Sequence, residues 1–283
     1  MSTELICELD RQGVLHLSLN RTEKSNALNS VLLSALNEAV LGAGADSQVR
    51  LLVFTGLGKH FCSGADTDAP ISEVKSRPVR LHQLCHTLYL CPKPMLAQVQ
   101  GACLGAGVAL IAGCDWVLAD PTAFFSLPEV RLGFAPGPLL PYLTRAMPAR
   151  LLKPYVLSGA RFQAEQALSM GLVHRLADIE QSPKIMAQTI DDLLLAAPQA
   201  QTSVKGLFRQ IDAQVPTLEL ADDLQAQVDP QRISAEADEA RFRNGGVDDA
   251  LRAELFEQAF GDFIGAIELG DFFAHEHDFV IAL

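Results

Sequence analysis

Short apolar segments that alternate with helical patterns constrain the fold of this chain more than any other feature. Residues 49–55, 95–99 and 116–119 are almost continuously apolar, which is typical of strands buried in a parallel sheet. Helix-spaced apolar residues occupy 79–90 and 101–113 between these segments. We therefore predict an α/β body in which the loops at one edge of the sheet carry the chemistry.

The ends of the chain add a hairpin and a helical region. Residues 5–20 alternate between apolar and polar side chains on either side of a turn at 11–13, which predicts a β-hairpin. After about residue 163, strand signals become sparse and helical patterns dominate. We expect a body over residues 1–200 and a helical, acidic C-terminal region over residues 201–283.

The charge balance limits the classes of partner. The chain has 34 acidic and 22 basic residues, which gives a net charge of −12, and the acidic excess lies beyond residue 211. An acidic surface does not displace the counterions of a nucleic acid. No apolar run approaches the roughly 20 residues of a membrane-spanning helix, and the first residues lack the pattern of a secretory signal. We expect a cytoplasmic protein with neither a nucleic-acid nor a membrane partner.

The cysteines indicate neither a disulfide framework nor a metal site. Six cysteines are spread along the chain without a Cys-x-x-Cys pair or a regular spacing. We therefore expect buried, reduced thiols and no bound metal.

Two loops that contain glycine directly follow predicted strands, HFCSGAD at 60–66 and QGACLGAG at 100–107. Glycine lets the backbone approach a ligand closely, and the second loop runs into an apolar helix whose first N–H groups favour negative charge. Each loop taken alone is better explained as a tight turn, because isolated glycine motifs are weak signals.

Glu129 is the third candidate feature, since it lies among Leu127, Pro128 and Val130. Apolar surroundings raise the pKa of a carboxyl group, which suits a general acid or base near neutral pH. Taken alone, a solvated glutamate beside a loop proline is the simpler interpretation.

Read together, five motifs resemble those of the enoyl-CoA hydratase/isomerase (crotonase) family over about residues 5–200. They are LNRTEKSNALN (19–29), FCSGAD (61–66), PKPMLAQVQGACLGAGVALIAGCD (92–115), LPEVRLGFAPG (127–137) and ALSMGLVHRL (167–176). The resemblance implies a crotonase-like spiral of ββα turns, followed by a helical region that forms homotrimers, often paired into hexamers.

The resemblance also implies roles for individual residues. The backbone N–H groups of Ala65 and Ala106 are expected to bind the thioester oxygen, and Glu129 is expected to move a proton. The residues expected to contact coenzyme A are Lys24, Ala27, Leu28, Asp66, Thr67 and Asp68. The implied substrate is an acyl-CoA or acyl-carrier thioester, with no cofactor beyond the coenzyme A that the substrate carries.

One position departs from the pattern of the two-glutamate hydratases. Their first catalytic glutamate lies three residues after the second oxyanion donor, where this chain has Ala109. The segment 133–142 also lacks their glycine-rich stretch and looks like that of one-glutamate hydratases that act on glutaconyl-type thioesters.

Three functions are compatible with this departure. The first is a one-glutamate hydratase that acts on a methylglutaconyl-type substrate, whose extra carboxylate helps to position water. The second is a Δ3,Δ2-enoyl-CoA isomerase, because Glu129 as a single base is enough to move a proton between two carbons. The third is a protein that binds CoA thioesters without turnover, because a fold does not determine a function.

Overall fold

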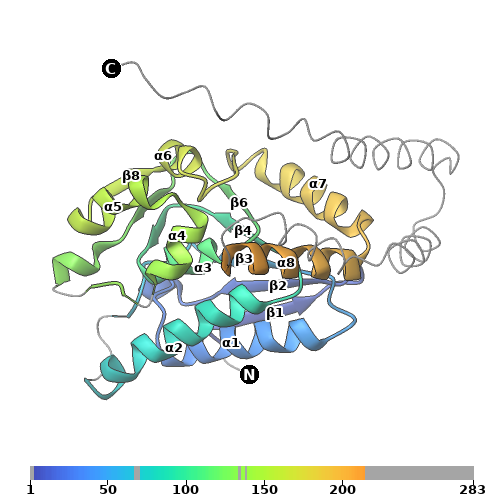
Figure 1. Cartoon of the computed structure of the whole chain (residues 1–283), viewed down its shortest axis with the longest axis horizontal. Coiled ribbons are helices and arrows are strands. Elements are labelled where there is room, and N and C mark those ends of the chain that lie inside the picture. The colour runs from blue at the N-terminus through green and yellow to red at the C-terminus, as the bar shows by residue number, and fades with distance from the viewer. Residues whose placement is uncertain (1–2, 67–70, 133–134, 138, 214–283) are drawn as a thin grey trace, which may run out of the picture. The chain divides into compact units, whose positions relative to one another are not determined.

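The computed structural model describes residues 3–66, 71–132, 135–137 and 139–213, with only the backbone described for 71–79, 132 and 212–213 (Figure 1). A six-stranded sheet contains, in spatial order, β1 (Leu5–Leu9), β2 (Val14–Leu19), β3 (Leu51–Gly56), β4 (Met95–Val99), β6 (Trp116–Ala119) and β9 (Arg175–Leu176). A three-stranded sheet contains β5 (Ala102–Leu104), β7 (Phe124–Ser126) and β8 (Arg161–Gln163).

The helices precede, separate and follow these strands. They are η1 (Thr22–Lys24), α1 (Ser30–Ala45), α2 (Ile71–Leu90), α3 (Ala106–Ala112), η2 (Pro128–Leu132), α4 (Leu140–Ala146), α5 (Ala149–Ser158), α6 (Ala164–Ser169), α7 (Ser182–Leu195) and α8 (Pro198–Ala213). None of them is long and apolar enough, within the described ranges, to cross a membrane.

The predicted hairpin is confirmed, since β1 and β2 pair antiparallel with Leu5 opposite Leu19. Asp10 closes its turn, because the carboxylate Oδ1 accepts hydrogen bonds from the Gln12 and Val14 N–H groups at 2.8 and 2.9 Å. The remaining pairs of the large sheet are parallel, as the nearly continuous apolar segments predicted.

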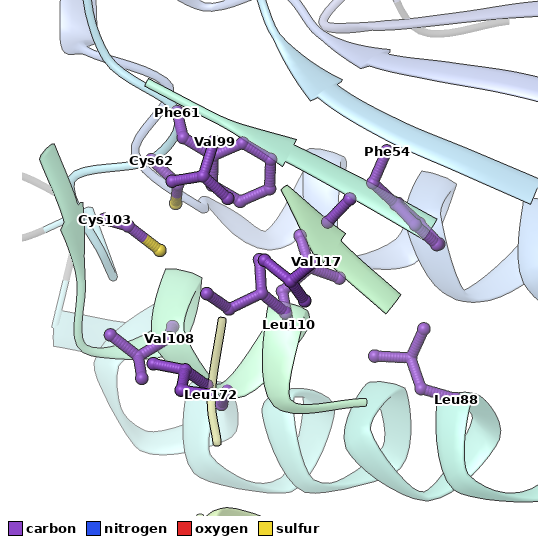
Figure 2. Close-up of a cluster of buried hydrophobic side chains, with 14 of the residues drawn as sticks. Phe54, Phe61, Cys62, Leu88, Val99, Cys103, Val108, Leu110, Val117 and Leu172 are labelled. Carbon is purple, nitrogen blue, oxygen red and sulfur yellow. The ribbon is translucent and has the colours of Figure 1, made fainter. Parts of the chain in front are cut away.

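Both faces of the large sheet are covered by helices, which explains why its strands are apolar throughout. On β3, Leu52 and Phe54 belong to a core shared with α1, α2 and α3, whereas Leu51 and Val53 pack toward α7. Figure 2 shows part of the first core, where Leu110 of α3 lies beside Val117 of β6, and Leu88 of α2 belongs to the same cluster. α1 and α2 lie side by side along this face (Figure 1).

Successive turns of the chain contribute one strand to each sheet. β4 enters the large sheet and β5 the small one before α3, and β6 and β7 repeat this division in the next turn. Isolated parallel bridges pair Leu28 with Ala65 and Cys62 with Cys103 of β5, so that the segment after each strand of the large sheet is joined to its counterpart in the next turn. This arrangement is the spiral of ββα turns that the resemblance implied.

Several elements were not predicted from the sequence. β5, β7, β8 and β9 have two or three residues each, which is too short for a period of two to be visible. α5 contains Pro154, a residue that argues against a helix. The expected boundary near residue 200 lies inside α8, and the expected region 201–283 lies outside the described residues from 214 onward.

Candidate active site

The motif segments 19–29 and 61–66 lie side by side, and a parallel β-bridge between Leu28 and Ala65 joins them. The Leu28 N–H donates to the Gly64 carbonyl at 2.7 Å, and the Asp66 N–H donates to the Leu28 carbonyl at 3.0 Å. In a parallel bridge of this kind, the N–H and C=O of the residue between the two bonds point to the opposite side. The Ala65 amide therefore faces away from Leu28.

The Ala106 amide lies at the first position of α3, where a helical N–H has no acceptor within the helix. Gly64 brings the two loops together, since a Cβ at this glycine would lie 3.9 Å from the Ala106 nitrogen and 3.1 Å from the Leu104 oxygen. In the part of the chain that the structure describes, neither the Ala65 nor the Ala106 N–H donates a hydrogen bond to a protein group.

Gly105 allows a carboxylate to approach the start of α3. Its φ is +49°, and a Cβ at this position would lie 2.6 Å from Glu129 Oε1 and 3.9 Å from the Gly64 Cα. The Gly105 N–H also donates to the Ser126 carbonyl at 2.8 Å, which ties the loop to the strand that leads to Glu129. The structure thus brings the two glycine loops and Glu129 together.

Glu129 lies on η2 with a side chain that is half-buried. Its Oε2 is buried and has no hydrogen-bond partner among the described residues. Burial raises the pKa of Glu129 above the ordinary 4.5, and its own backbone N–H opposes this effect. A carboxylate with a raised pKa and a free oxygen is suited to accept a proton from a neighbouring molecule.

Ala109 is buried on α3, one turn after Ala106, and contributes no titratable group. Cys62 lies beside the same helix, because a Cβ at Gly107 would be 2.8 Å from the Cys62 Cβ. Its Sγ accepts a hydrogen bond from the Gly64 N–H at 3.4 Å, and burial raises its pKa to about 12. All six cysteines are free thiols, and Cys62 is a packing residue rather than a nucleophile.

The residues expected to contact coenzyme A occupy different environments. Lys24 is exposed on η1, while Ala27 and Leu28 are buried and follow it. The Asp66 carboxylate is buried in an ion pair with Arg21, Oδ2 to Nη2 at 2.9 Å. Thr67 and Asp68 lie outside the described residues.

The histidines near the site have structural partners. His60 Nδ1 accepts the Ala102 N–H at 3.0 Å, and burial together with Lys59 lowers the pKa of His60. His82 and His86 are exposed on α2 with stacked rings, and His82 also contacts the ring of Tyr142 on α4.

Arg21 and Asn26 were missed by the sequence reasoning although both lie in the first motif. Asn26 is fully buried with φ +58°, and its amide donates to the Leu57 and His60 carbonyls at 2.9 Å each. Asparagine tolerates this left-handed conformation better than most residues. The one local signal for Asn26 was its place in a Ser-Asn-Ala turn. Its role could not be predicted from that turn, because its hydrogen-bond partners lie some 30 residues away in the sequence.

Comparison with known proteins identifies the family. The family model described as "Enoyl-CoA hydratase/isomerase" matches residues 10–245. The chain is 34% identical to the 2,3-dehydroadipyl-CoA hydratase of Escherichia coli over 207 residues, which are 71% of this chain and 80% of that protein. It is 33% identical to the mitochondrial Delta(3,5)-Delta(2,4)-dienoyl-CoA isomerase of Rattus norvegicus over 183 residues, 59% of this chain and 56% of that protein.

A solved structure supports the same assignment. The crystal structure of an enoyl-CoA hydratase from Shewanella pealeana superimposes with a TM-score of 0.76 at 30% identity, covering 83% of this chain and 90% of that one. The ββα spiral, the meeting of two glycine loops with Glu129 and the extent of these matches lead to one conclusion. The chain belongs to the enoyl-CoA hydratase/isomerase family.

Proposed function

We propose that this chain is a one-glutamate hydratase that adds water to, or removes it from, an enoyl-CoA thioester. The observation that carries the proposal is the contact between the Glu129 carboxylate and Gly105, directly beside Ala106 and Gly64. A thioester oxygen held by the Ala65 and Ala106 N–H groups would place its reacting carbons within reach of that carboxylate. Coenzyme A enters as part of the substrate, and no separate cofactor is required.

The proposed chemistry needs one proton carrier and one anion site. Glu129 takes a proton from water as the water oxygen bonds to C3 of the enoyl group, and the electron pair of the double bond moves to the thioester oxygen. The two N–H groups stabilise this enolate, and one such donor contributes about 3–4 kcal/mol in measured oxyanion holes. Protonated Glu129 then gives its proton to C2, which completes the addition of one water.

The absence of a carboxylate at Ala109 also favours a second candidate, a Δ3,Δ2-enoyl-CoA isomerase. In this reaction Glu129 removes a proton from C2 and returns it to C4, so that a single base and the same enolate site are sufficient. The similarity to a dienoyl-CoA isomerase supports keeping this candidate.

The acyl group of the substrate is proposed to carry a second carboxylate, as in methylglutaconyl-type thioesters. The support is the one-glutamate pattern of the motif together with the similarity to a hydratase named for a dicarboxylic acyl-CoA. A thioester of an acyl carrier protein has the same reacting group as an acyl-CoA, so the proposal includes it as an alternative substrate.

An activity assay in which the products are separated by chromatography and identified by mass separates these functions. The purified protein is incubated with crotonyl-CoA, a 3-enoyl-CoA, a glutaconyl-type CoA and the acyl-carrier form of the substrate that reacts. A gain of one water supports the hydratase, and a shifted double bond at constant mass supports the isomerase. Binding without turnover on every thioester would contradict both and favour the non-catalytic alternative.

The protein is further proposed to act in the cytoplasm as a homotrimer or a pair of trimers. Exposed apolar side chains on α8 support a subunit interface, because Val204, Phe208 and Ile211 recur at helical spacing with exposed fractions of 49%, 63% and 41%.

A further inference from the structure

Arg21 is a buried charged residue beside the candidate site that no motif role explains. It is 8% exposed, and its partner Asp66 is 7% exposed. Removing both charges from water costs several kcal/mol per ion, which only good geometry and further hydrogen bonds can offset. Its three contacts show what this guanidinium holds together.

The Arg21 guanidinium contacts three separate segments. Nη2 lies 2.9 Å from Asp66 Oδ2, Nη1 donates to the Ala27 carbonyl, and Nε lies 3.2 Å from Glu4 Oε1. Glu4 precedes β1, Ala27 precedes the bridge residue Leu28, and Asp66 follows the bridge residue Ala65. Arg21 therefore binds both sides of the bridge that orients Ala65.

The arginine is itself held by a closed turn. Its N–H donates to Asn26 Oδ1 at 2.9 Å, and its carbonyl accepts the Asn26 N–H at 2.8 Å. Because Asn26 is also bonded to the loop before Phe61, the backbone that carries the guanidinium is fixed relative to the loop that carries Ala65.

We propose that Arg21 is a positioning residue for the enolate site. It acts through the Ala27–Leu28 peptide on the direction of the Ala65 N–H, and the Asp66 carboxylate holds its guanidinium in place. This proposal rests on the proposed function, because it requires a thioester oxygen at Ala65 and Ala106.

The Ala27 carbonyl that accepts from Arg21 belongs to the same peptide as the Leu28 N–H. That N–H donates at 2.7 Å to the Gly64 carbonyl, which belongs to the same peptide as the Ala65 N–H. Loss of the Arg21 contacts therefore allows both peptides to rotate, and the direction of the Ala65 N–H changes with them. In this proposal the Asp66 side chain has a structural role, because its carboxylate holds Arg21. A contact between the Asp66 backbone and coenzyme A is compatible with that role.

Two conservative variants test the proposal, and Glu4 remains beside the Arg21 guanidinium, Oε1 to Nε at 3.2 Å, when Asp66 is changed. Arg21→Lys keeps the positive charge but cannot contact Ala27, Asp66 and Glu4 at once, because an ammonium lacks the planar fork of a guanidinium. Asp66→Asn keeps an acceptor oxygen and the side-chain shape. A matched control is Lys205→Met, which removes the ion pair that Lys205 forms with Asp115 at 2.5 Å between α8 and the start of β6.

The direct readout is the polarisation of a bound carbonyl. The saturated thioester butyryl-CoA, labelled with ¹³C at the thioester carbon, binds without hydration, and its carbonyl stretch is measured by isotope-edited infrared difference spectroscopy. Wild-type protein and Lys205→Met should lower the stretch frequency relative to free butyryl-CoA. Arg21→Lys and Asp66→Asn should lose most of this shift, because a misdirected N–H no longer donates along the carbonyl axis.

Kinetics provide the second readout. On the substrate found by the mass assay, both variants should lower kcat by roughly 10- to 100-fold, since misplacement by about 1 Å has effects of this size. The dissociation constant of butyryl-CoA should change by less than about threefold, because the hydrogen bond to the thioester oxygen is much weaker in the bound ground state than in the enolate-like transition state. Circular dichroism and gel filtration verify that each variant is folded.

The outcomes separate this inference from the proposed function. If either folded variant keeps both the carbonyl shift and the wild-type kcat, the positioning role of Arg21 is wrong while the proposed function stands. If wild-type protein binds butyryl-CoA with no carbonyl shift, the enolate site at Ala65 and Ala106 is wrong, and the positioning role is overturned with it.

Discussion

Glu129 combines the two properties that a proton carrier needs, a position beside the start of α3 and a carboxyl pKa above its ordinary value. Glu129→Gln preserves the side-chain shape but cannot accept a proton. We expect turnover to fall by roughly 10²–10⁴-fold with little change in thioester binding. Steady-state kinetics with a binding titration check this, and near wild-type turnover in the variant would reject Glu129 as the base.

The pH profile should report the same group. A base must be ionised, so activity should rise with pH through a midpoint above 4.5, because burial raises the pKa of Glu129. The measurement is kcat/KM between about pH 4 and 8, where the free enzyme's essential base appears as the acidic limb. A midpoint at or below the ordinary carboxyl value would contradict this assignment.

The same carboxylate should lower the stability of the fold at neutral pH. Since the pKa of Glu129 is higher in the folded protein, its stabilising contribution is complete below pH 4.5 and is lost as the pH rises through the folded-state pKa. Glu129→Gln should therefore raise Tm at pH 7.5 but have a smaller effect near pH 4. Glu180→Gln, at an exposed carboxylate, is the control and should leave Tm unchanged at both values.

At the scale of elements, α3 is important for its first N–H as well as for its apolar core face. Ala106 is the first residue of this helix, a position where proline is accommodated by the backbone. Ala106→Pro removes the N–H, so kcat should fall about 10²–10³-fold, the loss observed when one oxyanion donor is deleted. The control Ala106→Gly retains the N–H and should keep kcat within about threefold of wild type; equal losses in the two variants would indicate a packing effect instead.

At the scale of the whole molecule, the exposed apolar residues of α8 predict self-association. Light scattering at micromolar concentration should give a mass of three or six 30.5-kDa chains. Phe208→Glu introduces a charge into the exposed stripe and should shift the mass toward a monomer, because burying an unpaired charge opposes assembly. Ser203→Glu adds the same charge on the same helix outside the stripe and should leave the mass unchanged. A monomeric wild-type protein would refute the trimer.

Local physics explains which features could be predicted from the sequence. The strands at 95–99 and 116–119 were predicted with their observed bounds, because a strand covered on both faces is apolar at nearly every position. The hairpin followed from its period of two and its turn, and Glu129 followed from a motif whose residues are neighbours in the chain. Each of these signals depends on residues close together in the sequence.

Only the tertiary structure decided how the site is arranged. The direction of the Ala65 N–H depends on a bridge to Leu28, and the Asp66 carboxylate forms an ion pair with Arg21, 45 positions earlier in the sequence. Neither contact produces a periodic pattern, because the energy of a buried ion pair comes from geometry between distant segments rather than from composition. The sequence therefore determined the α/β layers and the residues that could react, and long-range packing determined which segments of backbone lie beside Glu129.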